Sequence, residues 1–341
     1  MRKKVLITGG AGFIAHHIID FLMKETDWNI ISLDRLDFSG NLNRIFEVAA
    51  KYPEKERKRI KIVYHDLKAE INEHVASFLN KPDMILHLAA ASTVERSITH
   101  PLEFIYDNVV GTANLLEYSR KIDNLETFLY FGTDEIYGPA PKGVNYKEKD
   151  RYNSTNPYSA SKASAEQLCV AWANTYKLPM IVTHCMNVFG YRQQKINVVP
   201  LFINKIDNGE EVVIHSNPER TEAGSRFYIH GDDVAEALYF IITKKPFIAP
   251  DYGGSKTQIY NIVGKEEITN LTLAEMIAEA QRKPLKYQLV DFHSSRPGHD
   301  LRYSLDGSLL KSLGWEPRIS LIDRIKQVTD WYLANPRWLG R

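Results

Sequence analysis

Two short segments of the chain contain residue types that move protons and support redox chemistry. Thr133, Asp134 and Glu135 set a hydroxyl beside two carboxyls, and Tyr158 stands four residues before Lys162. Residues four apart share one face of a helix, so the phenol and the ammonium are expected to be neighbours. A nearby ammonium favours the phenolate, so the sequence predicts that Lys162 lowers the pKa of Tyr158 from its usual value of about 10. Together the segments indicate an enzyme that combines redox and acid–base chemistry on one substrate.

The two carboxyls can serve one substrate only if the strand before them has ended, since neighbouring strand residues point to opposite faces. Gly132 and the later Gly138-Pro139 favour a turn at this point. Two carboxyls in one pocket also push their pKa values apart, which supplies one acid and one base. Simpler roles stay open: Asp134 as a helix cap and Glu135 as a surface ion-pair residue.

Short apolar runs alternate with helical patterns up to Gly190. We expect strands at 5–8, 29–33, 61–64, 84–88, 127–131 and 180–184, and helices from Phe13, over 101–120 and over 158–176. This alternation predicts an α/β fold with a Rossmann-type, doubly wound parallel sheet. After Gly190 shorter strands at 212–215, 227–230 and 259–263 indicate a smaller C-terminal α/β domain.

A glycine-rich turn falls between the first expected strand and the first expected helix. Gly9 and Gly12 would let the backbone turn tightly and let a pyrophosphate approach the helix N-terminus. Asp34 ends the next strand 22 residues after Gly12, where a carboxylate binds ribose hydroxyls and repels a 2′-phosphate. This favours NAD over NADP, although Arg35 follows directly and opposes that preference. Asp66, after the third strand, is either an adenine contact or a turn residue.

These motifs resemble those of the extended short-chain dehydrogenase/reductase family, and within it those of the nucleotide-sugar 4,6-dehydratases. The resemblance covers essentially the whole chain. The matching segments are residues 8–14, 87–90, 108–112, 133–138, 156–162, 187–190 and 296–300. The tyrosine–lysine and glycine motifs are shared across the superfamily, whereas Thr-Asp-Glu narrows the reaction.

The resemblance implies that NAD oxidises the sugar at C4, that water is lost across C5–C6, and that the hydrogen returns to C6. Tyr158 would take the C4 hydroxyl proton, Thr133 would bind near the C4 oxygen, and Lys162 would hold the ribose. Glu135 would remove the C5 proton, and a protonated Asp134 would give its proton to the departing C6 oxygen. The product would be a 4-keto-6-deoxy sugar, as in deoxysugar biosynthesis, and NAD would be tightly retained.

The same resemblance implies further binding residues and an assembly. It adds four NAD contacts, Phe13, Ile14, Leu67 and Ala89. On the substrate side it assigns Ser92, Arg96, Asn187, Arg226 and Arg296, the two last arginines as phosphate clamps. It also implies a homodimer built through the helices that begin near Pro101 and Tyr158.

The domain assignment follows from these motifs. Residues 1–185, with 227–262, are expected to form the NAD-binding Rossmann domain, and residues 186–226 and 263–341 the sugar-nucleotide domain. Thr93, Tyr191 and Asn197 depart from the family pattern on the sugar-nucleotide side, which leaves the base and the hexose open. We expect dTDP-glucose first and UDP-glucose next.

Two other functions remain open. A nucleotide-sugar 4-epimerase on the same scaffold needs Tyr158, Lys162 and NAD, but not the carboxyl pair. A catalytically silent NAD-sensing regulator needs only the fold, and the intact tyrosine, lysine and threonine argue against it.

The composition narrows the class of protein. The 341 residues are 44% hydrophobic and 25% charged with a net charge of +1, which is typical of a soluble globular protein and gives no case for nucleic acid or an anionic membrane. No apolar run is long enough to span a bilayer, and the N-terminus lacks a signal peptide, so we expect a cytoplasmic protein. Cys169 and Cys185 are expected to be reduced and buried. The histidines show no metal-ligand spacing, so no metal is expected.

Overall fold

The computed structural model describes residues 2–244, 257–292 and 301–341. The chain forms two compact units. Unit 1 consists of Met1–Ile136, Asn156–His184 and Ala235–Tyr260, and unit 2 of Tyr137–Thr155, Cys185–Val234 and Asn261–Arg341. No helix in the described segments is long and apolar enough to cross a membrane. Cys169 and Cys185 are buried and are not joined by a disulfide, as expected.

Two longer segments group differently from the assignment made on sequence. Residues 137–155 and 227–234 belong to unit 2, as do Cys185 and residues 261–262, whereas the sequence analysis placed them all with the Rossmann domain. Long-range backbone pairing explains the first: the amide of Ala140 donates to the carbonyl of Arg302 at 3.0 Å, and that of Tyr146 to Ser304 at 3.1 Å. For the second, Ile229 pairs with Val188.

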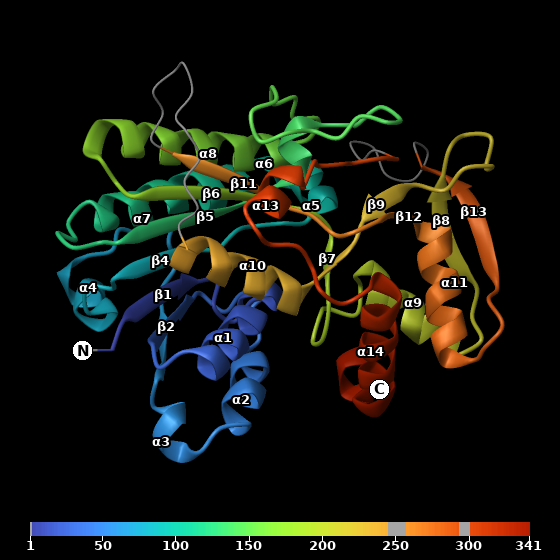
Figure 1. Cartoon of the computed structure of the whole chain (residues 1–341), viewed down its shortest axis with the longest axis horizontal. Helices are drawn as coiled ribbons and strands as arrows, with labels where there is room; N and C mark the ends of the chain where they lie inside the picture. Colours follow the sequence, from blue (N-terminus) through green and yellow to red (C-terminus); the bar gives the residue numbers. More distant parts are fainter. Residues whose placement is uncertain (1, 245–256, 293–300) are drawn as a thin grey trace. The chain divides into compact units, whose positions relative to one another are not determined.

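The centre of unit 1 is a seven-stranded sheet, which confirms the expected fold class (Figure 1). Its order is β3-β2-β1-β4-β5-β6-β11. The strands are β1 Lys4–Thr8, β2 Asn29–Asp34, β3 Ile60–Tyr64, β4 Met84–His87, β5 Thr127–Thr133, β6 Met180–Cys185 and β11 Gln258–Ile262. The pairs from β3 through β5 are parallel. The order reverses between β1 and β4, and ligands of such sheets bind at the carboxyl ends of the strands near this reversal.

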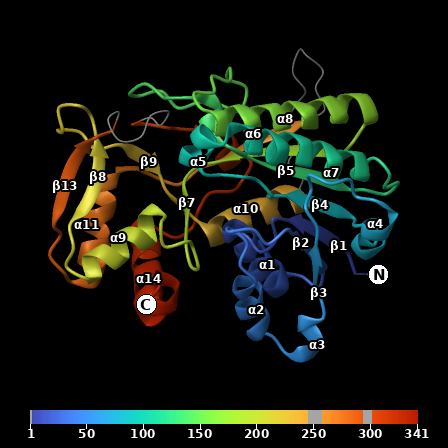
Figure 2. The same cartoon turned by 180° about the vertical axis from the view of Figure 1, so that it is seen from behind.

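Helices cover both faces of this sheet (Figures 1 and 2). One face carries α1 Phe13–Glu25, α2 Leu42–Ala50 and α10 Gly231–Lys244, and the other carries α4 Glu73–Leu79, α7 Gly111–Ser119 and α8 Pro157–Tyr176. Short α3 spans Glu54–Arg57. Apolar side chains such as Leu115, Ala165 and Cys169 pack against the strands in one buried cluster. Burial on both faces explains why the strands read as continuous apolar runs.

The helix expected over 101–120 forms as three consecutive segments. They are α6 Pro101–Phe104, the π-helical η1 Ile105–Val110 and α7, and α5 Val94–Thr99 precedes them. Short π-helical turns within longer helices often occur at functional sites. Here the turn carries Asp107 and Asn108, which both contact other parts of unit 1.

In its described residues, unit 2 contains three two-stranded sheets and a small helical core. The strand pairs are β7 Val188–Phe189 with β10 Ile229–His230, β9 Ser225–Phe227 with β12 Glu267–Thr269, and β8 Val212–Ser216 with β13 Tyr287–Asp291. The helices are α9 Val198–Asp207, α11 Asn270–Gln281, α13 Ser308–Ser312, α14 Leu321–Ala334 and the 3-10 turn η3 Pro336–Leu339. Ile203, Leu273, Ile277 and Ile325 are fully buried among them. The single strand expected at 227–230 is divided between β9 and β10, which pair with different partners.

Candidate active site

The strand that carries the carboxyl pair ends where the chemistry requires it. β5 ends at Thr133, and the 3-10 turn η2 Asp134–Tyr137 follows at once. The Thr133 hydroxyl donates to Asp134 Oδ1 at 3.2 Å, and the Glu135 amide donates to Thr133 Oγ1 at 3.4 Å. Asp134 is buried and Glu135 half-buried. The expected turn is confirmed, so strand alternation does not force the two carboxyls to opposite faces.

Gly132 lets this end of β5 approach β6 closely. A Cβ atom there would lie 2.8 Å from the Thr183 carbonyl oxygen and 3.0 Å from His184 Cδ2. Behind it, His184 Nε2 and Glu166 Oε2 are 2.9 Å apart, and both side chains are fully buried. The residue before the Thr-Asp-Glu segment therefore has no room for a side chain.

Tyr158 lies in the first turn of α8, buried beside Thr133. Thr133 lies close enough to the phenol for its hydroxyl to lower the pKa of Tyr158. The Tyr158 ring also packs edge-on against Phe104, with the ring centroids 6.3 Å apart, and against Val94. The tyrosine is thus both a packed residue and a partner of the Thr-Asp-Glu segment.

Lys162 lies one turn further along α8, also buried. Its Nζ donates to the Phe131 carbonyl oxygen at 2.7 Å and stands 4.3 Å from the centroid of the Tyr130 ring. Burial lowers the pKa of Lys162 to about 8. One of the three N–H donors of the ammonium is therefore used to hold the amine against β5.

The pKa of Tyr158 is raised, whereas the sequence predicts that Lys162 lowers it. Burial raises the pKa of Tyr158 well above its usual value, the charges of Glu135 and Asp134 raise it further, and the hydrogen bond with Thr133 only partly offsets them. The tyrosine is more protected from ionisation than an exposed phenol, because desolvation and two carboxyls outweigh the favourable contact.

Asn156 is a site residue that the sequence analysis did not identify. Its Oδ1 accepts from the Ser159 amide at 2.8 Å and so caps α8. Its Nδ2 donates to Glu135 Oε2 at 3.2 Å. The side chain therefore links the start of α8 to one of the two carboxyls. The sequence signal for this residue is its place directly before Pro157, which is typical of a helix start.

Asn108 is a second residue without a predicted role. Its amide group exchanges two hydrogen bonds with the backbone of Ala91, at 2.8 and 3.0 Å, and donates to Ser161 Oγ at 2.8 Å. The side chain is 2% exposed. It fastens η1 both to α8 and to the loop after β4, which is the loop that carries the expected sugar contacts.

The glycine turn after β1 has the geometry of a phosphate cradle. Gly9 adopts a φ of +66°, and a Cβ there would lie 2.9 Å from the backbone N and Cα of Ala89. The Gly12 amide donates to the Gly9 carbonyl at 2.8 Å, and Gly12 begins α1 with no side-chain cap. Phe13 and Ile14 form the first turn of that helix. Close backbone approach and an uncapped helix N-terminus fit a pyrophosphate.

Asp34 ends β2 next to this turn. Its Oδ2 accepts from the Ala11 amide at 3.0 Å and its Oδ1 from the Leu36 amide at 2.7 Å. Burial raises the pKa of Asp34, and the two backbone hydrogen bonds oppose that shift. The carboxylate is thus fixed beside the glycine turn, in the position expected for a ribose contact. The donor set fits the expected dinucleotide.

The other expected cofactor residues lie near the carboxyl ends of their strands. Asp66 follows β3, and its Oδ1 accepts from the Lys68 amide at 3.0 Å, as in a strand-end turn. The Leu67 carbonyl accepts from Asn114 at 2.8 Å. The Ala89 amide donates to Thr8 Oγ1 at 3.2 Å.

The expected substrate residues are distributed over both units. In unit 1, Ser92 is exposed after β4, and Arg96 on α5 donates to Glu103 at 2.6 Å. In unit 2, Asn187 is exposed before β7, and Arg226 on β9 donates to the Leu301 carbonyl at 2.6 Å. Arg296 lies outside the described residues.

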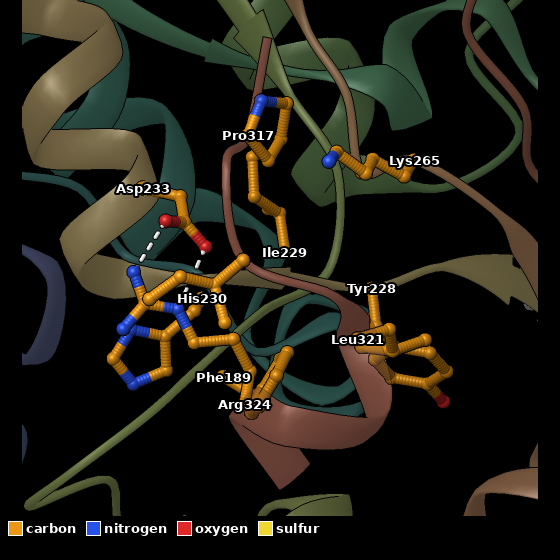
Figure 3. Close-up of a pocket in the computed structure, with 11 residues that line it drawn as sticks. Phe189, Tyr228, Ile229, His230, Asp233, Lys265, Pro317, Leu321 and Arg324 are labelled. Carbon is orange, nitrogen blue, oxygen red and sulfur yellow. Dashed lines mark hydrogen bonds and ion pairs between the residues drawn. The ribbon is translucent and has the colours of Figure 1, made fainter. Parts of the chain in front are cut away.

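Unit 2 also contains a small pocket, which Figure 3 shows with its lining side chains. Arg324 of α14 donates through Nε to Asp233 of α10 at 3.1 Å, and a second contact makes the pair bidentate. Burial raises the pKa of Asp233, and Arg324 opposes that shift. The lining includes no predicted site residue, and the ion pair ties α14 to the start of α10.

The chain is similar in sequence and in fold to known proteins over nearly its whole length. Residues 5–262 match the model of the NAD dependent epimerase/dehydratase family. The chain is 35% identical over 365 residues to dTDP-glucose 4,6-dehydratase of Escherichia coli, covering 99% of this chain and 96% of that one. A dTDP-glucose 4,6-dehydratase from Streptomyces venezuelae, crystallised with NAD, superposes with a TM-score of 0.83 at 29% identity, covering 98% of both chains. UDP-glucose 4-epimerase of Thermus thermophilus, also with NAD, gives 0.82 at 26% identity, covering 97% of this chain and 99% of that one.

Proposed function

Because the chain belongs to the NAD dependent epimerase/dehydratase family, we propose that it is an NAD-dependent nucleotide-sugar 4,6-dehydratase acting on dTDP-glucose. The observation that carries this proposal is Thr133-Asp134-Glu135 at the end of β5, with Tyr158 buried beside Thr133. The reaction would yield a 4-keto-6-deoxy sugar for deoxysugar biosynthesis. The relatives named for this reaction match almost the whole chain.

Bound NAD would supply the oxidising power at C4 and return the same reducing equivalents at C6. The chain would hold it with the Gly9–Gly12 turn at the pyrophosphate and Asp34 at a ribose. Phe13, Ile14, Asp66, Leu67 and Ala89 would complete the binding surface. Lys162, which already donates to Phe131, would use its other N–H groups on the second ribose.

Tyr158 would remove the proton of the C4 hydroxyl, and Thr133 would orient both oxygens. The raised pKa of Tyr158 makes this step demanding in the free chain. An incoming positive charge beside the phenol would lower that pKa, since opposite charges favour ionisation. The oxidised nicotinamide ring carries such a charge, so NAD binding and tyrosine ionisation would favour each other.

Glu135 would then remove the C5 proton, and Asp134 would protonate the C6 oxygen as it leaves. Oxidation at C4 makes the C5 proton acidic, so a carboxylate is a sufficient base. Asn156 would fix the base, because its amide donates to Glu135 Oε2 at 3.2 Å. Asp134 is buried at the end of β5, next to Glu135 in the sequence.

We further propose that unit 1 binds NAD and that unit 2 supplies most contacts to the nucleotide of the substrate. Asn187, Arg226 and Arg296 would bind the diphosphate, and Ser92 and Arg96 the sugar. UDP-glucose is the second candidate substrate. One relative, a trifunctional enzyme of Arabidopsis thaliana named for UDP-glucose 4,6-dehydratase activity, is 33% identical over 341 residues, which span 48% of its length.

A panel of nucleotide sugars tests the proposal. The purified protein is incubated with dTDP-glucose, UDP-glucose, CDP-glucose and GDP-mannose, and the products are weighed by mass spectrometry. We expect dTDP-glucose to lose one water. If no sugar nucleotide loses water, the dehydratase proposal is wrong; binding of NAD without any sugar nucleotide would instead support the regulator.

The alternative of a 4-epimerase cannot be separated by fold, since the epimerase and dehydratase neighbours superpose almost equally well. Glu135→Gln separates them by chemistry. A dehydratase variant should still oxidise C4 and accumulate NADH, seen at 340 nm, without losing water. An epimerase should interconvert the C4 epimers nearly as fast as the unchanged protein.

We also propose a homodimer formed through the α5–α7 segment and α8, as in the family. Large apolar side chains on this segment are exposed: Leu102 is 69% exposed, Tyr106 55%, and Ile98 and Ile105 40% each. A cluster of exposed apolar side chains on neighbouring turns is typical of an interaction surface.

A further inference from the structure

Arg35 is the residue that most opposes a preference for NAD over NADP. It directly follows Asp34, and an arginine in this region commonly accepts the 2′-phosphate of NADP. A free guanidinium here would partly cancel the repulsion that Asp34 exerts on that phosphate. The state of this side chain therefore bears on which dinucleotide the chain accepts.

The guanidinium of Arg35 is already occupied by two carboxylates. Its Nε and Nη2 donate to Asp37 Oδ2 at 3.0 and 2.7 Å, and its Nη1 and Nη2 donate to the two oxygens of Asp107 at 2.5 and 2.7 Å. A guanidinium has five N–H donors, and these contacts use four. The fifth is on Nη1, and Asp66 Oδ1 is 3.7 Å from that nitrogen.

The cluster is also negative overall. Asp37, Asp66 and Asp107 bring three carboxylates to two cations, Arg35 and Lys68, whose Nζ is 3.5 Å from Asp66 and 3.7 Å from Asp107. Asp107 is the most shielded member, with its side chain 4% exposed, so its attraction for Arg35 is weakly screened. A 2′-phosphate entering beside Asp34 would therefore meet excess negative charge.

Contacts other than those with Arg35 hold the segments that carry both carboxylates. Asp37 Oδ1 accepts from the amide and the hydroxyl of Ser39 at 2.9 and 2.8 Å. Asp107 belongs to the π-helical turn η1, and its neighbour Asn108 fastens that turn to the loop after β4 and to α8. The guanidinium of Arg35 is therefore held between the carboxylates of Asp37 and Asp107, whose segments also have other contacts.

We propose that Asp107 and Asp37 determine cofactor choice by binding Arg35, which keeps its guanidinium from the 2′-phosphate of NADP. This proposal rests on the proposed function only in that a dinucleotide binds with its ribose at Asp34. Asp37 and Asp107 come from segments far apart in the sequence. The proposal adds them to Asp34 as residues that discriminate NAD from NADP.

The test measures binding of NADH and NADPH to nucleotide-free protein through the fluorescence of the reduced nicotinamide. The variants are Asp37→Asn, Asp107→Asn and the double variant, each also made with Arg35→Ala. Asp20→Asn is the charge-matched control, because it removes one carboxylate elsewhere in unit 1. Asp20 lies on α1 and pairs with Lys51, which follows α2. Circular dichroism checks that each variant is folded, and the more exposed Asp37→Asn keeps the test valid if Asp107→Asn misfolds.

We expect the unchanged protein to bind NADH far more tightly than NADPH. In the double variant the ratio of the two dissociation constants should fall by about tenfold or more, the usual effect of one charge-assisted contact. Arg35→Ala in that background should restore the ratio, and 0.5 M salt should reduce the effect. Asp20→Asn should leave the ratio unchanged.

Three results would overturn the inference. Equal binding of NADH and NADPH by the unchanged protein would show that the cluster does not discriminate. An unchanged ratio in the folded variants would leave the discrimination to Asp34. Binding of neither nucleotide would reject both this inference and the NAD-dependent function, whereas the first two results leave that function intact.

Discussion

Two ionisable side chains at the proposed active site have pKa values displaced in opposite senses. The phenol of Tyr158 is harder to ionise than an exposed tyrosine, and the ammonium of Lys162 loses its proton more easily than an exposed lysine. Burial is the first cause of both shifts, because it favours the neutral form of each group. At pH 7 the phenol is therefore neutral, whereas the Lys162 amine, with a pKa of about 8, still carries its proton in most molecules.

The influence of Glu135 on Tyr158 can be measured directly. In Glu135→Gln the pKa of Tyr158 should fall, because the variant removes a negative charge that opposes the phenolate. The pH at which C4 oxidation reaches half its maximum should move down by roughly one unit. Rapid-mixing measurement of NADH formation between pH 6 and 10 would show it. Glu117→Gln, which removes a carboxylate paired with Arg120 on α7, should leave the curve in place.

Lys162 should make the stability of the fold depend on pH. Its pKa is about 8 in the folded chain and 10.5 as the ordinary value, so between these limits the unfolded chain binds more protons. Stability gained from this group therefore rises with pH through that window, and below pH 8 the full cost of burying the charge applies. The free energy of unfolding of the unchanged protein relative to Lys162→Met should rise by about 3 kcal/mol from pH 8 to 10.5. Urea titrations at several pH values would show a flat difference if the amine is not buried.

At the scale of elements, the site depends on how closely β5 approaches β6. Gly132→Ala should destabilise the protein by about 1–3 kcal/mol, because its Cβ would meet a backbone oxygen that cannot move aside. It should also displace Thr133 and lower turnover. A thermal melt tests the first effect. An unchanged melting temperature would mean that the strand ends are farther apart than described.

Most elements of unit 1 were predictable from sequence because strands β1, β2, β4, β5 and β6 are buried on both faces. The runs at 5–8, 29–33 and 180–184 differ from the observed strands by one or two residues. The division between β9 and β10 was not predictable, since it arises from pairing with two different distant strands. The membership of residues 137–155 in unit 2 likewise depends on hydrogen bonds to residues more than 150 positions away.

The turn and the helix that carry the proposed site residues were predictable, whereas the pKa of Tyr158 was not. The spacing of Tyr158 and Lys162 and the turn after Thr133 follow from local rules, and the structure confirms the helix and the turn. The shift of Tyr158 depends on how much water burial removes, which spacing does not contain. Asn156 was missed because its amide reaches Glu135 across 21 residues.

At the scale of the whole molecule, the proposed dimer is the feature most open to direct test. Leu102→Asp with Tyr106→Asp places two charges in the exposed apolar cluster, and it should convert a dimer into a monomer. Sedimentation equilibrium should give the mass of one chain. Phe46→Asp, on α2 and 53% exposed, is the matched control and should stay dimeric. An unchanged protein that sediments as one chain would refute the dimer.

The shared contacts of Asn156 have a consequence for how this enzyme could be altered by mutation. The Asn156 side chain both caps α8 and donates a hydrogen bond to Glu135. A single replacement there would therefore disturb both folding and the proposed reaction. An aspartate at position 156 would still cap α8, but its negative charge would lie beside that of Glu135 and repel it. A substitution at Asn156 must therefore preserve both the helix cap and the hydrogen bond to Glu135. Efforts to engineer a new reaction on this scaffold would do better to keep Asn156 unchanged.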